Sequence, residues 1–525
     1  MLDDFVEQYY LHIHPLIPLI DEGEFWDMYS QTEREGASDD KMSLLLFQTM
    51  LFSSCTLLYD MDTESSLLPL AQSALLLTGW VPPSNLDQIP YKTWLGRAIQ
   101  HAKSLNADRL ATATATPGSS TTKHHRALCR LWWCCVSMDR ISPLCTRFDP
   151  YLTRGSFDFE ADKSLIMSDL EGEIFRSNVY NPASKKRLVG LFEVYLNLTI
   201  VLTDLLTLVY PFEDSLPSAQ WPSQEEDAKI QKCEAAMEDW FVRASTQFPP
   251  VKEATQTTSD KRKDLHKSVA LHINLMYIYY HHAKIAFCHY KILYYLHQDS
   301  DGSAEGAWKT TKLKKSRSEL QDAATNMAQL LEELTRRRLV RWLPISAIAC
   351  IAMPLALSVV SARLAAVNGE FSFESPISAA SSKRHLEVLM GAMKSFLPQY
   401  DGVELVKETV KRAADLAQAD TQAQPANTGP VITDWTHHLA KNPSLYMKMT
   451  MAIDMSISKG RIAEDNDFPA WLFSRMTLGR GDVPTGQPVP QPTPQSTRHF
   501  DDAMGPYFGA DTSYMESIQD LMGWT

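Results

Sequence analysis

The sequence predicts an all-α fold, a large and irregular multi-helix domain. Apolar residues recur at helical spacing along almost the whole chain, and no alternating run bounded by turn residues predicts a strand. The 525 residues are 44% hydrophobic, enough to bury a large core. No repeat of fixed length indicates an α-solenoid. We expect an α-helical domain over residues 1–478, a Pro/Gly/Gln-rich linker over 479–498 and a separate segment over 499–525.

Apolar helical faces begin at the first residues. Residues 1–21 are amphipathic until Pro15 and Pro18 interrupt the pattern. Further helices are expected in the first half of the chain at Lys41–Asp60, Tyr91–Leu110 and, after the polar spacer Ala111–His125, Arg126–Arg140.

The second half continues the helical pattern with longer apolar segments. The expected helices are Ser184–Pro211, Lys232–Ala244, His266–Leu296, Ser318–Arg338 and Gly402–Ala419. Polar breaks are expected at Asp299–Gly306, Gln418–Pro430 and Gly479–Arg498. The last of these breaks is Pro-rich and low in apolar residues, which predicts a disordered or polyproline-like linker.

One segment imitates a membrane span. Residues Trp342–Val367 carry a single charge, Arg363, and follow a run of arginines, which is the pattern of a transmembrane helix. Pro344, Pro354, the many small residues and the lack of a second such segment favour a buried, proline-interrupted pair of helices instead. A spanning helix is the alternative.

Charge and cysteine usage limit the class of protein. The formal net charge is −13, from 63 acidic and 50 basic residues, which argues against binding duplex DNA over an extended surface. The eight cysteines have no regular spacing, and residues 1–34 read as an amphipathic start and not as a signal peptide. These features indicate a reducing intracellular compartment.

The stretch Arg126–Arg140 is the most distinctive in the chain. On a helical projection its cysteines, Cys129, Cys134 and Cys135, point in three directions, so they cannot converge on one zinc ion. Basic and polar side chains share one arc, and apolar side chains cover the opposite side. The arc contains Arg126, Arg130, Ser137 and Arg140; the apolar side contains Leu128, Leu131, Trp132, Cys135 and Met138. We expect a nearly all-round apolar helix buried in the protein.

Asp139 falls on the apolar side of this helix, beside Trp132. A carboxylate there must be paired or hydrogen-bonded, because an unmatched buried charge costs several kcal/mol. We predict a basic partner within salt-bridge distance and a role in fixing the packing register of the core.

Enzymatic and metal-binding motifs are missing from the sequence. The histidines around residues 266–297 lack the His-Glu-x-x-His arrangement, and His282 and His289 share a face without a third ligand. Paired acids, as at Asp39-Asp40, do not continue as the Asp-Asp-x-x-Asp of helical terpenoid synthases. With no phosphate loop, nucleophile elbow or paired-thiol motif, we expect a protein that is not an enzyme and holds no cofactor in this chain.

The C-terminal segment stands apart in composition. From His499 to Thr525 there are five acids and no Lys or Arg. Ser513 and Glu516 form a capping-box pattern that predicts a short helix. Its apolar side carries Tyr514, Ile518, Leu521, Met522 and, beyond the helix, Trp524. An acidic, aromatic helix after a Pro-rich linker is typical of a partner-docking segment, and packing back on the domain is the alternative.

Taken together, these pieces resemble the middle homology region of fungal zinc-cluster (Zn₂Cys₆) transcription factors. Gly96, Ala98 and Ile99 match its Gly-x-Ala-Ile start. The matching core motif is Arg130, Leu131, Trp132, Trp133, Asp139 and Arg140. Residues 179–206 and 445–469 are similar to further segments of the subgroup that contains cutinase, fatty-acid and amide-utilisation activators. The likeness covers most of residues 1–475.

The chain departs from that family in two respects. Thr146-Arg147-Phe148 stands where the family usually has Gly-Arg-Pro. The zinc cluster needs two Cys-x₂-Cys pairs, and the sequence contains none. Zinc is therefore expected only if the protein has an N-terminal cluster outside this sequence. Such a cluster would be missing here because of a truncation or because a gene model omits an exon. The alternative is that the protein acts without a cluster.

The resemblance implies a nuclear regulator of a metabolic or secondary-metabolite gene set. Its expected partner is a transcriptional coactivator or the general transcription machinery, and a homodimer is possible. DNA is expected to be contacted only indirectly or through the missing module. No membrane association is expected. The alternatives are an intracellular α-helical scaffold or small-molecule sensor without a direct role in transcription and, further behind, a terpenoid-type enzyme.

Overall fold

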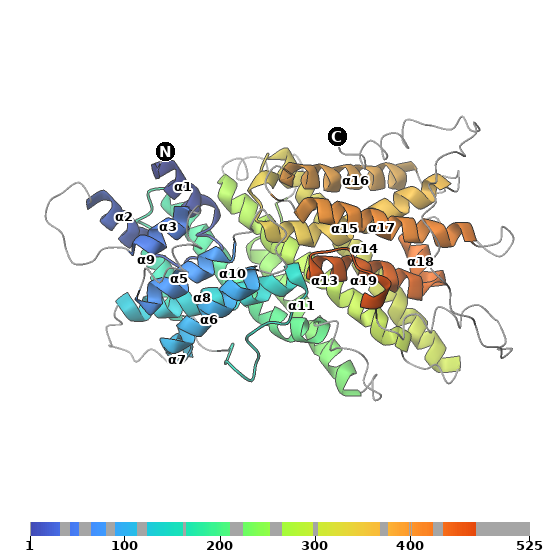
Figure 1. The fold of residues 1–525 in the computed structure, drawn as a ribbon, viewed down its shortest axis with the longest axis horizontal. Coiled ribbons are helices and arrows are strands. Elements are labelled where there is room, and N and C mark those ends of the chain that lie inside the picture. The colour runs from blue at the N-terminus through green and yellow to red at the C-terminus, as the bar shows by residue number, and fades with distance from the viewer. Residues whose placement is uncertain are drawn as a thin grey trace, which may run out of the picture.

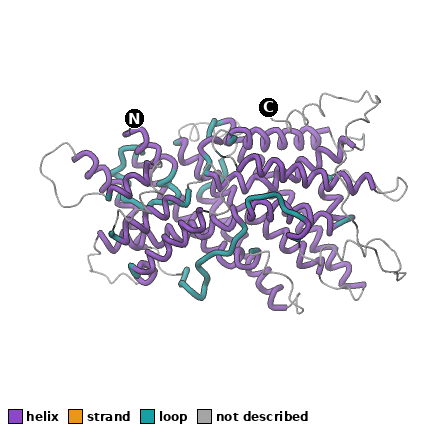
Figure 2. Tube along the Cα trace, in the orientation of Figure 1, coloured by secondary structure: helices purple, strands orange, loops and turns teal. Residues whose placement is uncertain are grey.

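The computed structural model describes thirteen stretches of the chain. They are residues 2–31, 43–51, 65–79, 90–112, 123–160, 164–210, 224–251, 265–297, 303–367, 376–397, 400, 402–423 and 434–468. Within these stretches all regular structure is helical and no strand occurs (Figure 2), which confirms the predicted fold class. The expected linker at 479–498 and the acidic segment at 499–525 lie outside the described residues.

The helices of the first part of the chain gather at one end of an elongated molecule (Figure 1). They are α1 (Leu2–His12), α2 (Glu22–Gln31), α3 (Leu44–Leu51), α5 (Leu67–Leu77), α6 (Pro90–Ser104), α7 (Ala107–Thr112), α8 (Lys123–Thr146), α9 (Ser164–Gly172) and α10 (Pro182–Val209).

The later helices form the other end, and α11 lies near the middle (Figure 1). The bounds are α11 (Gln224–Gln247), α13 (Lys267–His297), α14 (Ser303–Arg336), α15 (Ile345–Val367), α16 (Pro376–Phe396), α17 (Gly402–Ala423), α18 (Trp435–Lys441) and α19 (Pro443–Lys459). Short 3₁₀ turns, Val340–Trp342 and Asp465–Asp467, precede α15 and follow α19.

Helix α8 is central to this arrangement. It packs against helices from both ends of the molecule, namely α5, α6, α7, α9, α10, α13, α15 and α19. One connected set of buried apolar side chains extends from Val6 to Phe468, and α8 lies within it. A helix with neighbours on many sides is largely buried, as expected for Arg126–Arg140, and the polar side chains that it carries into the interior need partners there.

Local sequence signals set several helix ends. Helix α10 starts where the Asn181 side chain accepts a hydrogen bond from the Ser184 amide, with Pro182 in the first turn. Helix α19 repeats this device with Asn442 and ends at Gly460, whose φ of 64° suits a residue without a side chain.

Several predicted boundaries were wrong. The expected helix Tyr91–Leu110 is broken into α6 and α7 at Asn106, which has a left-handed φ of 57°. Helix α14 begins at Ser303, inside the predicted loop 299–306, and α17 continues to Ala423, inside the predicted linker 418–430. In these places the helices continue through polar residues, because helix propensity does not require an apolar residue at every turn.

The apolar segment that imitates a membrane span also differs from expectation. Residues 345–367 form one helix that continues through Pro354, and not an interrupted pair. A second helix, α10, is also long and apolar enough to cross a membrane, contrary to the expectation of a single such segment. In their most apolar windows, 78% of the residues of α15 and 72% of those of α10 are buried inside the protein.

Candidate functional site

The predicted core motif lies on α8 and is enclosed by the protein. Its members, Arg130, Trp132, Trp133, Asp139 and Arg140, are each at most 1% exposed. Both tryptophans pack edge-on against Phe157, with ring centroids 5.2 and 5.7 Å from it. The arginines were expected on the polar arc of α8, yet the structure buries them as deeply as the tryptophans.

Asp139 and Arg140 form a clamp that holds the segment following α8. The Asp139 carboxylate accepts hydrogen bonds from the Tyr151 and Leu152 amides, each at 2.8 Å. Arg140 Nη1 lies 2.6 Å from Asp139 Oδ2, and Arg140 Nε donates to Thr203 Oγ1 of α10 at 3.0 Å. The prediction that Asp139 is buried beside a basic partner is confirmed. Burial raises the pKa of Asp139, although Arg140 and the two amides oppose this shift.

Arg130 lies in a buried ionic cluster at the other end of α8. Its guanidinium contacts Asp169 of α9 and Glu173 just beyond α9, and its Nη2 lies 3.6 Å from Asp21. The wider cluster joins several ion pairs. Its carboxylates are Asp21, Glu22, Asp27, Asp169 and Glu173, and its cations are Arg126, Arg130, Arg176 and Lys185.

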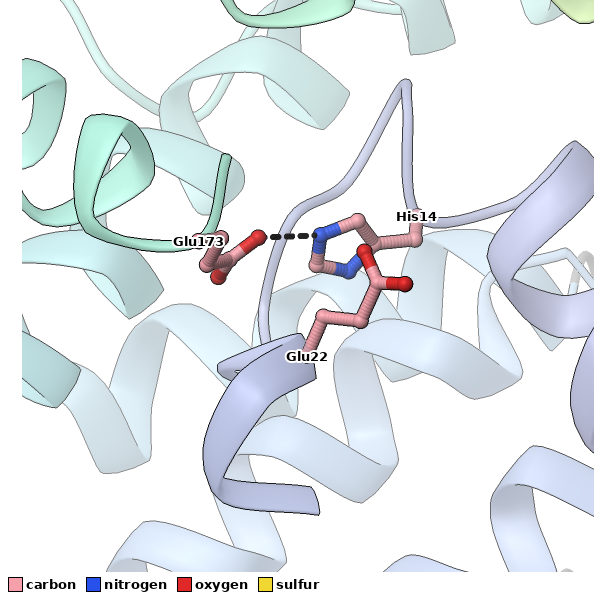
Figure 3. Close-up of side chains that lie close together, drawn as sticks. All are labelled: His14, Glu22 and Glu173. Carbon is pink, nitrogen blue, oxygen red and sulfur yellow. Dashed lines mark hydrogen bonds and ion pairs between the residues drawn. The ribbon is translucent and has the colours of Figure 1, made fainter. Parts of the chain in front are cut away.

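The centre of this cluster joins three separate segments. His14 from the chain after α1, Glu22 from the start of α2 and Glu173 converge in the interior (Figure 3). His14 Nε2 donates to Glu173 Oε2 at 3.0 Å, and Lys185 Nζ lies 2.5 Å from Glu22 and 2.8 Å from Glu173. The network therefore fixes α1 and α2 to the α8–α10 layer.

These three residues have a spacing that a metal ion could bridge, because their ligand atoms lie within 4.8 Å of one another. Lys185 already supplies a cation to both carboxylates. Burial would raise the pKa of Glu173, but Arg130, His14 and Lys185 outweigh it and hold that pKa well below its usual value. Burial and the Lys185 ammonium lower the pKa of His14. His14, Glu22, Glu173 and Lys185 therefore form an ion-pair network in which Lys185 supplies the positive charge.

Arg147 forms a second clamp, at the position where the sequence departs from Gly-Arg-Pro. It follows the last residue of α8, is 3% exposed and has a left-handed φ of 60°. Its Nε donates to Asp454 Oδ1 of α19 at 2.7 Å, and its other nitrogens donate to the carbonyls of Leu144 and Ala349. A strained backbone at a bulky residue persists only when its surroundings hold it, as these bonds do.

The cysteines do not fit a zinc cluster. Cys129, Cys134, Cys135, Cys145, Cys233, Cys288 and Cys350 are free thiols, and Cys55 lies outside the described residues. Among the described residues, none of these thiols belongs to a group of ligand atoms close enough to share a metal. The histidines of α13 form no such group in the described part of the chain either. His289 instead bonds to the Tyr446 hydroxyl at 2.9 Å.

Sequence reasoning missed the partners of the arginines. Asp169, Glu173, Lys185 and Asp454 were not singled out, although each is at most 7% exposed. Asp454 carried a usable signal, because it is the one charge in the apolar run "MAIDMSIS". The predicted docking residues Tyr514, Ile518, Leu521, Met522 and Trp524 lie outside the described residues.

Comparison with known proteins supplies the functional context. The chain is 24% identical over 395 residues to a protein named "Transcription factor" from Fusarium pseudograminearum, covering 66% of this chain and 42% of that protein. It is 28% identical over 209 residues to cutinase transcription factor 1 beta of Fusarium vanettenii, covering 34% of this chain and 22% of that protein. Both relatives are fungal transcription factors.

This chain is thus similar to fungal transcription factors. It spans less than half the length of either relative. No protein-family model matches the sequence, and no solved structure matches it significantly.

Proposed function

We propose that this chain is the regulatory part of a fungal transcription factor that acts in the nucleus. The observation that carries the proposal is the similarity to a fungal transcription factor over 66% of the chain. The Trp-Trp and Asp-Arg motif of α8, which resembles that of fungal zinc-cluster transcription factors, also supports the proposal, and its side chains are buried in the protein. Such a helix supports a stable domain and offers no reactive group to a substrate.

The finer assignment follows the same resemblance. The controlled genes form a metabolic or secondary-metabolite set, as the name of the cutinase regulator suggests for its own targets. DNA is contacted through a zinc-cluster module or a partner outside these 525 residues, since the net charge of −13 disfavours direct contact. The α-helical domain receives the regulatory signal.

Activation is assigned to the acidic segment 499–525. A helix of two or three turns is too short to be stable alone in water, so it would fold against a coactivator groove. The apolar contacts would come from Tyr514, Ile518 and Leu521, while the acids steer the encounter. Charge alone is screened over about 8 Å at physiological ionic strength, so it cannot supply the binding energy.

The test is a reporter assay with the full chain fused to a heterologous DNA-binding domain. Activation that is lost when residues 499–525 are removed supports the proposal. Replacing Ile518 and Leu521 with Ala should abolish activation more completely than replacing Glu516 with Gln and Asp520 with Asn. A silent full-length fusion would favour the scaffold or sensor alternative, and a greater effect of the acidic substitutions would reject the apolar docking face.

A further inference from the structure

A crevice of about 420 Å³ lies between α11, α13 and α14. The residues that line it follow helical spacing, so each helix presents one face. They are Gln231, Glu234, Ala235, Met237 and Glu238 of α11, Lys284, Phe287 and Lys291 of α13, and Lys315 and Glu319 of α14. No motif in the sequence pointed to this place.

Four of the charges that line the crevice form an ion-pair network, which we call the floor: Lys291, Lys315, Glu234 and Glu319. Lys291, whose side chain is 3% exposed, lies 2.6 Å from Glu319 and 3.2 Å from Glu234, and Lys315 lies 2.8 Å from Glu234. Burial would raise the pKa of Glu234, but the hydrogen bonds and charges of Lys315 and Lys291 lower it to about 2. These floor charges satisfy one another and need no ligand.

The rim differs from the floor. Neither Lys284 nor Glu238 makes an ion pair or a hydrogen bond with another described residue. Helices α11 and α13 are antiparallel, since Trp240 stacks on Tyr280 while Glu226 accepts from Tyr290. That pairing sets Glu238 at about the level of Lys284 across the crevice.

The rim therefore offers one unpaired cation and one unpaired anion on opposite walls. Between them lie the edges of Met237 and Phe287, which are 3% and 2% exposed and leave room for a small apolar group. A ligand with a single charge would contact only one of the two rim groups. A small molecule with both charges and a short apolar part matches the whole rim.

We propose that this crevice binds a free α-amino acid as a zwitterion. Its carboxylate lies on Lys284, its ammonium group on Glu238, and its side chain against Met237 and Phe287. The proposal concerns binding to the chain itself and stands independently of the proposed role in transcription, because it is measured on the purified protein.

The test is isothermal titration calorimetry of the full chain with each proteinogenic L-amino acid at millimolar concentration. We expect a subset with small apolar side chains to bind. The best binder should lose about tenfold or more in affinity as its carboxamide, which lacks the carboxylate, and as its N-acetyl derivative, which lacks the ammonium group.

Variants locate the site. Lys284→Gln and Glu238→Gln should each weaken binding by about tenfold, because each removes a charge-assisted contact. The matched controls are Lys314→Gln on α14 and Glu193→Gln on α10, both exposed and outside the crevice, which should leave binding unchanged. Failure of every amino acid to bind, equal binding of the truncated derivatives, or equal binding by the rim variants and the controls would overturn the proposal. Circular dichroism verifies that the variants are folded.

Discussion

Lys185 Nζ lies 2.8 Å from Glu173 Oε2, the same oxygen that His14 Nε2 contacts at 3.0 Å. One carboxylate oxygen, enclosed by the protein, thus joins α10, the segment after α9 and the chain after α1. A buried ion pair of this kind adds little net stability compared with an apolar core. Removal of one partner is costly, however, because the remaining charge is left without compensation.

The first prediction concerns this lysine. Lys185→Met should destabilise the protein by about 3–5 kcal/mol, because Glu22 and Glu173 lose their shared cation. Adding Glu22→Gln should recover part of the loss, since one of the stranded charges is removed. Urea unfolding of the single and double variants measures both effects. Additive losses in the double variant would contradict the coupling.

A second prediction concerns Asp139. Asp139→Ala should cost about 3–5 kcal/mol, since Arg140 is left charged in the core and the Tyr151 and Leu152 amides lose their acceptor. Glu193→Ala, at an exposed position of α10, is the control and should change stability by less than about 0.5 kcal/mol. A loss for Asp139→Ala as small as that of the control would show that the clamp does not hold the segment after α8.

Asp454 provides the third prediction. Asp454→Ala should destabilise by about 3–5 kcal/mol, because Arg147 keeps its charge and its left-handed backbone without a carboxylate partner. Arg147→Gly removes the buried charge and suits the φ of 60°. Asp454→Ala combined with Arg147→Gly should therefore be more stable than Asp454→Ala alone, as chemical denaturation would reveal. A double variant that is less stable than Asp454→Ala would show that the unpaired Arg147 charge does not cause the loss of stability.

The fourth prediction concerns pH. Burial, followed by the Arg147 charge, lowers the pKa of His289 to about 3, whereas an unfolded histidine titrates near about 6.5. Below about pH 6.5 the unfolded chain binds a proton at this histidine that the folded protein does not bind. The unfolding free energy therefore falls as pH decreases from about 6.5 towards 3, and this effect of His289 is absent above about pH 6.5. His289→Gln should reduce the slope of unfolding free energy against pH in this window by about 1.4 kcal/mol per unit. Parallel curves for the two proteins would contradict this assignment.

The fifth prediction concerns zinc and DNA. The purified chain should contain no stoichiometric zinc and show no nanomolar affinity for duplex DNA at physiological salt. Among the described residues no cysteine belongs to a group of three or more ligand atoms close enough to hold a metal ion, and the net charge is −13. Elemental analysis and a fluorescence anisotropy titration measure the two properties, and a positive result in either would reject this view of the chain.

The fold class could be predicted because helical periodicity is a local property of the sequence. The burial of Asp139 followed in the same way, since a projection of α8 shows which side chains surround it. The burial of Arg130 and Arg140 did not follow. A helical projection cannot tell whether a polar arc faces water or a partner from another segment. The partners of these two arginines, Asp169, Glu173 and Thr203, come from elsewhere in the chain.

Boundaries and partners were less predictable for a related reason. Helix α14 starts at Ser303 in a polar stretch, where the apolar pattern carries no information. The crevice between α11, α13 and α14 depends on how those helices pack, and its rim residues Lys284 and Glu238 read as ordinary solvated charges in the sequence.

Arg147 and Asp454 are 307 residues apart in the chain. At a synthesis rate of about 5–20 residues per second, Asp454 leaves the ribosome roughly 15 to 60 s after Arg147. Throughout that interval the C-terminal end of α8 has neither its counterion nor the covering helix α19. The growing chain therefore exposes a cationic, apolar surface until α19 has been synthesised, and a surface of this kind is prone to aggregation while it is uncovered.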